Sequence, residues 1–207
     1  QIPHLIRAAL SQILNVSESA VRVIKPDVGG GFGLKGQLFP EEVVLPALAR
    51  KLDHPLKWVE DRRESLMAGG HAHEERLHLS AAFDAEGSLL ATKSLIDGDS
   101  GAHSTFPFGA GLDPVTGALN IFGAYRHKVS EFQARAFASN KAPAVSYRGV
   151  GQIQSVFAVE RLMDIAADRL KMDPADLRKH NLYTKDEFPV TSPGGNEFDT
   201  GAYKETL

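Results

Sequence analysis

The segment "EERLHLSAAFDAEGSLLATKSLI", which runs from Glu74 to Ile96, decides the fold class that this sequence predicts. In its first half, apolar side chains recur at every second position, at Leu77, Leu79, Ala81 and Phe83. This period of two is typical of a β-strand with one buried face. Asp84–Gly87 is a turn sequence, and residues 89–96 then return as a second strand. The segment therefore predicts an antiparallel β-hairpin.

Helical patterns surround this hairpin on both sides. Four helices are predicted, over residues 3–14, 40–52, 152–170 and 173–180. The strongest pattern belongs to residues 152–170, where the apolar side chains fall on one face at helical spacing. Asp173 is a good N-cap residue for the last helix, and Pro174 suits its first position.

Three short apolar runs predict further strands, over residues 21–24, 55–61 and 128–137. Residues 106–116 and the segment beyond residue 183 are rich in glycine or proline and are predicted to be loops. Because strands and helices are mixed and at least one hairpin is present, we predict an α+β fold. It would consist of mixed sheets with antiparallel hairpins and packed helices.

Composition excludes several classes of protein. The chain has 207 residues and a formal net charge of −3 without a basic run, so a nucleic-acid-binding surface is not expected. No apolar run approaches the roughly 18–20 residues that a membrane helix needs. The absence of cysteine excludes disulfides, thiolate metal sites and iron–sulfur ligation by this chain. Gln1 directly precedes a helical pattern and "FDTGAYKETL" ends within another, so we expect a fragment of a longer protein.

The stretch Val28–Gly36, "VGGGFGLKG", is the strongest candidate for a binding loop. Glycine lets a main chain approach a ligand more closely than any other residue does. Gly31-x-Gly33-x-x-Gly36 also fits the dinucleotide-binding pattern. Against an NAD or FAD site, three residues separate the loop from the next predicted helix, and Phe32 would crowd a phosphate. The dinucleotide site stays an alternative, as does a non-catalytic interaction module.

Three further segments agree with this loop and carry a resemblance to a known family. "VRVIKPDVGGGFGLKG" is similar to the first cofactor-binding segment of the molybdenum hydroxylases, the large subunits of xanthine dehydrogenase, aldehyde oxidase and carbon monoxide dehydrogenase. Gln1 lies 31 residues before Phe32, as a glutamine does in that family. "SNKAPAVSYRGVGQ" and "AVERLMDIAADRLKMDPADLRKHNL" resemble its second signature and the segment that follows. The resemblance covers nearly the whole chain, which would be a partial cofactor-binding domain over residues 1–207.

The resemblance implies a molybdenum–pterin cofactor, as molybdopterin or its cytosine dinucleotide. It implies an oxidoreductase that hydroxylates a small molecule with oxygen derived from water. Iron–sulfur clusters and flavin would lie on other domains or subunits, and the rest of the large subunit would complete the site. The general base would lie outside this chain, which alone would be inactive. The expected compartment is the cytoplasm, with the periplasm as the alternative.

The resemblance also implies roles for individual residues. Gln1 matches a glutamine that contacts the molybdenum oxo ligand, and Arg148 matches an arginine that stabilises negative charge on the substrate. The expected cofactor contacts are Gly30, Gly31, Phe32, Gly33, Gly149 and Gly151. No direct metal ligand is expected; His71 and His73 are interpreted as surface residues.

Two departures from the family pattern narrow the expected substrate. Purine-oxidising members carry glutamate directly after the lysine of the loop, where this chain has Gly36. Copper-dependent carbon monoxide oxidisers carry a cysteine-bearing loop near the arginine, where this chain reads "YRGVGQ". An aldehyde or an N-heterocycle remains as the expected substrate.

Overall fold

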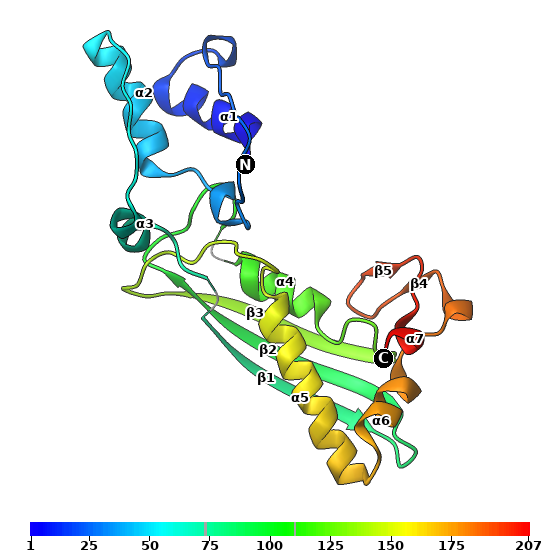
Figure 1. The fold of residues 1–207 in the computed structure, drawn as a ribbon. Helices are drawn as coiled ribbons and strands as arrows, with labels where there is room; N and C mark the ends of the chain where they lie inside the picture. The colour runs from blue at the N-terminus through cyan, green and yellow to red at the C-terminus, as the bar shows by residue number, and fades with distance from the viewer. Residues whose placement is uncertain (73, 110) are drawn as a thin grey trace. The chain divides into compact units, whose positions relative to one another are not determined.

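A computed structural model describes residues 1–72, 74–109 and 111–207. The chain forms two compact units. The first consists of residues 1–72, 100–110 and 138–148, and the second of residues 73–99, 111–137 and 149–207. Each is a set of segments that are distant in the sequence, and Figure 1 labels their helices and strands.

The first unit contains three helices and long irregular connections. They are α1 (Pro3–Leu14), α2 (Pro40–Leu52) and α3 (Arg62–Ala68), with short 3₁₀ turns at Glu18–Ala20 and Leu34–Gly36. Proline occupies the first turn of α1 and α2, where its missing N–H costs nothing. α1 and α2 are in contact, and Arg50 of α2 donates a hydrogen bond to the carbonyl oxygen of Leu14 (3.0 Å). The predicted bounds of both helices are confirmed.

The second unit is built on a three-stranded sheet in the order β1-β2-β3. The strands are β1 (Glu75–Phe83), β2 (Leu89–Gly101) and β3 (Val129–Ala138). β1 and β2 form the predicted antiparallel hairpin, with Leu77 opposite Ile96. In the turn, the Ser88 N–H donates to the Asp84 carboxylate (2.7 Å) and Gly87 adopts a φ of 89°. Glycine is favoured there because other residues rarely adopt a left-handed backbone.

Helices α4 (Leu112–Asn120), α5 (Gln152–Leu170) and α6 (Pro174–Asn181) complete the packed part of this unit. Figure 1 shows α5 lying across the sheet, and α5 contacts α4, β1 and α6. The apolar faces of these helices, β2 and the segments that follow α4 and α6 form one buried cluster: Leu89, Ile96, Ala118, Ile121, Phe122, Tyr125, Val159, Met163, Ala166, Ala167, Leu177 and Leu182. The single core and its mixed elements confirm the predicted α+β fold.

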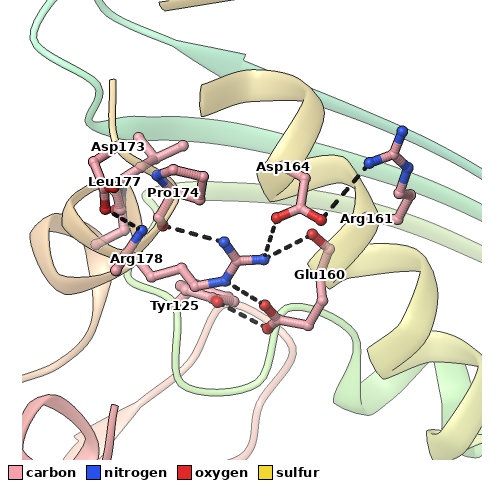
Figure 2. A network of polar contacts seen from close by, with 10 residues as sticks. Tyr125, Glu160, Arg161, Asp164, Asp173, Pro174, Leu177 and Arg178 are labelled. Atoms are coloured by element: carbon pink, nitrogen blue, oxygen red, sulfur yellow. Dashed lines mark hydrogen bonds and ion pairs between the residues drawn. The ribbon is translucent and has the colours of Figure 1, made fainter. Parts of the chain in front are cut away.

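A polar network joins α6 to α5 (Figure 2). The guanidinium of Arg178 donates to Glu160 (Nε to Oε2, 2.6 Å) and to Asp164 (2.8 Å). Tyr125, which follows α4, donates its hydroxyl to the other oxygen of Glu160 (2.8 Å). Burial, together with this hydrogen bond, raises the pKa of Tyr125, so the phenol stays protonated as a donor. At the start of α6, the Asp173 carboxylate accepts from the N–H of Ala175 (2.8 Å), as predicted for an N-cap.

The last 25 residues, predicted to be a loop with a helix beginning within "FDTGAYKETL", contain more secondary structure than this prediction. They contain a 3₁₀ turn (Lys185–Glu187), a small antiparallel pair of β4 (Val190–Thr191) and β5 (Glu197–Phe198), and the short helix α7 (Tyr203–Thr206). Four aromatic rings hold this segment together, at centroid distances of 5.8–6.3 Å: Tyr183, Phe188, Phe198 and Tyr203. Glycine and proline in residues 189–195 obscured this arrangement in the sequence.

Three predicted elements are wrong. Residues 21–24 and 55–61 contain no strand, and their apolar side chains are largely exposed, including Val59 at 72%. Because a short apolar run is equally compatible with irregular backbone, it cannot identify a strand without a buried face. The predicted loop over residues 106–116 contains the first half of α4 instead. Pro114 lies in the first turn of α4, where proline is compatible with a helix.

Candidate functional site

The glycine loop belongs to the first unit and turns back on itself. Phe32 and Gly33 have φ angles of 50° and 90°, so two successive residues adopt left-handed backbone conformations. For Phe32 this conformation is strained, since a side chain at positive φ is disfavoured. The 3₁₀ turn then closes the loop, with the Gly36 N–H donating to the carbonyl oxygen of Gly33 (2.8 Å). Within the described residues, the N–H groups of Phe32 and Gly33 donate to no acceptor.

Gln1 lies directly against this loop. Its backbone amine donates to the carbonyl oxygen of Lys35 (2.9 Å). Its side-chain amide occupies the space beside Gly31, so that a Cβ atom added to Gly31 would overlap the amide of Gln1. Glycine at position 31 is therefore required if Gln1 is to keep this place. The structure brings together Gln1 and the loop 31 residues downstream.

Arg148, which lies 116 residues after Phe32 in the sequence, reaches the same loop. Its backbone N–H donates to the carbonyl oxygen of Phe32 (2.8 Å), and its guanidinium carbon lies 5.1 Å from the centroid of the Phe32 ring. A cation over an aromatic face is attracted by the ring quadrupole, which orients the charged group. The Tyr147 ring also lies near Phe32, at 6.4 Å between centroids. The glycine loop and the segment that contains Arg148, both predicted to bind the cofactor or substrate, therefore meet at Phe32.

Two buried polar residues beside the loop were not found by sequence reasoning. Gln37 is 1% exposed, and neither atom of its side-chain amide has a partner within the described residues. The Ser146 hydroxyl is likewise buried and unpaired, and the Ser146 carbonyl oxygen lies 3.0 Å from where a Cβ of Gly33 would stand. Unpaired buried polar groups cost free energy and are rare in folded proteins. The sequence offered only their positions as a signal, since Gln37 directly follows the loop and Ser146 lies within "SNKAPAVSYRGVGQ".

A cavity of about 310 Å³ lies next to the loop in the same unit. It is lined by Gln1, Leu34, Lys35, Phe39, Glu41, Glu42, Leu45, Trp58, Glu60, Ser65 and Gly69. One cation and three carboxylates therefore face an otherwise apolar and aromatic space. The volume is within the range of small-molecule pockets.

Gly149 and Gly151 belong to the second unit, where packing accounts for one of them. Gly151 caps the start of α5 with a φ of 75°, and an added Cβ would lie 2.8 Å from the backbone nitrogen of Gly117 in α4. The hydroxyl of Ser155 donates to the Gly151 carbonyl oxygen (2.8 Å), within the buried contact of the two helices. Gly149 has a φ of 98° and faces Ile153. Their expected contact with the cofactor stays a prediction.

The geometry does not form a dinucleotide site. No strand precedes the loop, and the glycines lead into a 3₁₀ turn rather than the N-terminus of α2, which begins at Pro40. Backbone N–H groups at a helix start are what bind a pyrophosphate, so the fingerprint lacks its main binding element.

In the described part of the chain, no group of three or more histidines and carboxylates is placed to hold a metal ion. No helix there is both long and apolar enough to cross a bilayer. His73 lies outside the described residues.

Comparison with known proteins identifies the class to which this fold and loop belong. The family model described as the molybdopterin cofactor-binding domain matches residues 1–182. The chain therefore belongs to the molybdopterin cofactor-binding domain family, as the resemblance indicated.

Individual relatives support the same family assignment. The nicotine 6-hydroxylase large subunit of Paenarthrobacter nicotinovorans is 39% identical over 210 residues, which cover 100% of this chain and 25% of the relative. The carbon monoxide dehydrogenase large chain of Hydrogenophaga pseudoflava is 33% identical over 100% of this chain and 26% of its own length. The crystal structure of quinoline 2-oxidoreductase from Pseudomonas putida 86 superimposes with a TM-score of 0.93 and 34% identity, covering 99% of this chain and 26% of that one. The chain thus spans about a quarter of the length of these relatives.

Proposed function

We propose that this chain holds the molybdenum–pterin cofactor of an oxidoreductase that hydroxylates an aldehyde or an N-heterocycle with oxygen derived from water. It would do so as one part of a longer large subunit. One observation carries the proposal: Gln1, the loop Gly31–Gly33 and Arg148 converge on one place, although 147 residues separate the first from the last. When bound, the cofactor supplies the two-electron redox chemistry of the reaction.

The residues present fit an anionic, oxygen-rich group. The free N–H groups of Phe32 and Gly33 are successive backbone donors in a turn, and successive N–H groups in a turn can form an anion-binding concavity. Gln1 holds its side-chain amide beside the same loop and can donate a further hydrogen bond. These three donors would bind and orient oxygen atoms of the cofactor. Gly30 and Gly31 would allow its close approach, and Gly149 and Gly151 are proposed as further contacts.

Arg148 is assigned to the substrate rather than to the cofactor. Its guanidinium is permanently charged and is positioned over the Phe32 ring. A cation fixed beside the reacting carbon would stabilise negative charge that develops on a neighbouring oxygen or ring nitrogen. The relatives named for nicotine and quinoline support an N-heterocycle over an aldehyde. Gly36, which replaces the glutamate of purine-oxidising members, argues against a purine.

The remaining parts of the proposal concern the larger assembly. Iron–sulfur and flavin groups would lie on other domains or subunits and accept the electrons, because this chain has no cysteine to bind a cluster. A relative named as the gamma subunit of a dehydrogenase complex supports a multi-subunit enzyme. A cytoplasmic location, with the periplasm as the alternative, completes the proposal.

The test is the molybdenum content of the native polypeptide in its longest form, purified from a host that makes the cofactor. We expect about one molybdenum per chain. Gly31→Ala should lower this value at least tenfold, since the new Cβ displaces the Gln1 side chain. Gly29→Ala is the matched control, because a Cβ there has no neighbour within 4 Å and the backbone is not left-handed. Absence of molybdenum from the folded native protein would refute the proposal and favour the non-catalytic module. Equal contents in both variants would remove Gln1 and Gly31 from the site.

A further inference from the structure

A groove of about 620 Å³ lies between β1 and α5 in the second unit. Its floor is made by the side chains that point to one face of β1: Leu77, Leu79, Ala81 and Phe83. Its wall is the flank of α5, where Phe157 is 73% and Ile165 is 42% exposed. Large apolar side chains concentrated along one groove mark an interaction surface more often than isolated exposed residues do.

The backbone of β1 offers a second, independent feature. In the sheet order β1-β2-β3, β1 is an outer strand, and within the described residues it pairs only with β2. Residues Leu77–Phe83 of β1 therefore present an open edge of N–H and C=O groups directly beside the apolar groove. Such an edge is a template for another strand, whose alternate side chains would enter the groove.

The charges in the groove indicate the chemistry of its occupant. Among the lining residues, the only charged side chains are Arg161 and Arg169, both on α5. Arg161 makes a long contact of 3.7 Å with Asp164, and its side chain is 64% exposed. An occupant with carboxylates would complement both cations. A second copy of this chain would instead bring two further arginines to the same place.

The spacing of the arginines sets the spacing of those carboxylates. Eight residues separate Arg161 from Arg169, which is about 12 Å along a helix axis at roughly 1.5 Å per residue. A β-strand covers that distance in about four residues, at roughly 3.3 Å each. Side chains alternate between the two faces of a strand, so residues four positions apart lie on the same face. Both carboxylates therefore point into the groove. An apolar residue midway between them would lie against Ile165, which is midway between the two arginines on α5.

We propose that an extended strand of the larger polypeptide pairs with the outer edge of residues Leu77–Phe83 in β1 and fills this groove. The strand carries Asp or Glu at two positions four residues apart, with an apolar residue between them. It lies outside Gln1–Leu207, and the proposal rests on the proposed function only in taking this domain to work within a longer chain.

The test places a photoreactive p-benzoylphenylalanine at Phe157 in the native polypeptide in its longest form. We expect a cross-link to a segment of the same polypeptide outside Gln1–Leu207 that has the predicted pattern. The same group at Val129, which is 62% exposed at the start of the opposite outer strand, is the control for non-specific capture. Amide hydrogen exchange across β1 should be slow in the same preparation, because its edge N–H groups are then paired.

Charge reversal sharpens the result. The double substitution Arg161→Glu and Arg169→Glu should lower the cross-link yield at least tenfold. The control, Arg161→Lys with Arg169→Lys, keeps both positive charges and should leave the yield within about twofold of that of the unsubstituted protein. A cross-link to a second copy, to a separate subunit or to a helical segment would overturn the proposal, as would no cross-link or a yield insensitive to charge reversal. Molybdenum content is measured on the same samples, so failure of this inference is distinguishable from failure of the proposed function.

Discussion

The two units of the molecule differ in how their structure is maintained. In the second unit, side chains from β2, α5 and α6 are fully buried, among them Ile96, Met163 and Leu177 at 0% exposure. In the first unit, neither α2 nor α3 has a buried residue, and the buried apolar side chains of α1 are Ile6, Ala9 and Leu10. The candidate cofactor loop lies in the unit with the smaller core.

The loop itself depends on backbone geometry rather than on apolar packing. Gly31 leaves room for Gln1, the Gly36 N–H closes the turn on Gly33, and the Arg148 N–H holds the Phe32 carbonyl. Changes in the second unit, which we call the packed unit, should therefore alter the free energy of unfolding. Changes in the first unit, which we call the loop unit, should alter cofactor binding or turnover at nearly constant stability. Both expectations can be tested by paired substitutions.

The largest effect is expected from Leu177→Ala in α6. Truncating a fully buried leucine leaves a cavity and should lower the free energy of unfolding by about 2–5 kcal/mol. Ile13→Ala in α1, where the side chain is 53% exposed, should cost less than about 1 kcal/mol. Urea unfolding followed by circular dichroism measures both values. Similar losses for the two variants would contradict the difference between the units.

Arg148→Ala should separate turnover from binding in the loop unit. Loss of one preorganised charge at a reaction site typically lowers the rate by about 10²-fold, or about 2.7 kcal/mol. Molybdenum content should stay unchanged, since the backbone N–H of residue 148 still donates to Phe32. Arg22→Ala, at an exposed arginine of the same unit, is the control. Undiminished turnover of the Arg148 variant would exclude this residue from the substrate site.

Arg178→Ala tests the polar network of the packed unit. The Arg178 side chain is 13% exposed, and its removal leaves Glu160 and Asp164 without their cation. A fully buried pair loses about 3–5 kcal/mol when broken, but both carboxylates here are about 40% exposed to water, so about 2 kcal/mol is expected. Arg161→Ala in α5, where the arginine makes only an exposed contact of 3.7 Å with Asp164, should change stability by no more than about 0.5 kcal/mol. Equal thermal shifts in the two variants would show that the network is not what fixes α6 on α5.

Local patterns in the sequence predicted much of the fold. The bounds of α1, α2 and α5, the hairpin of β1 and β2, and the Asp173 cap agree with the structure. Each of these depends on periodicity or capping within a few residues. α4 was missed because its turn-like residues, Gly111 and Pro114, lie at the start of a helix that is recognisable only from the burial of Ala118. The strand predicted at residues 21–24 failed because no neighbouring strand or buried face supports it.

The candidate site was predictable only in part, for a related reason. The glycine loop is visible locally, but nothing in the spacing of Gln1 and Arg148 places them beside it; the family resemblance did so. The burial of Gln37 and Ser146 follows from tertiary contacts and has no counterpart in the local sequence. Recognising a family therefore supplies long-range contacts that periodicity cannot supply.

The smallest effect is expected from a pH titration of the packed unit. His127 is 9% exposed, its Nδ1 lies 2.9 Å from the Tyr125 carbonyl oxygen, and its ring packs against Phe122. Burial lowers the pKa of His127, so folding favours the neutral imidazole. In the unfolded chain a histidine takes up its proton near pH 6.5. The unfolded state therefore binds the proton first as the pH falls, and stability declines below about pH 6.5 until the folded pKa is passed.

The free energy of unfolding, measured by urea titration between pH 7.5 and pH 5.5, should decrease across this window by less than about 1.4 kcal/mol for each pH unit, the limit for one proton. His127→Gln should reduce the slope, because glutamine does not titrate. The window stays above the range in which exposed carboxylates titrate, so the difference between the two slopes reports on His127. An unchanged slope in the variant would mean that protonation of His127 does not oppose folding, and that the core of the packed unit admits a charge at this position.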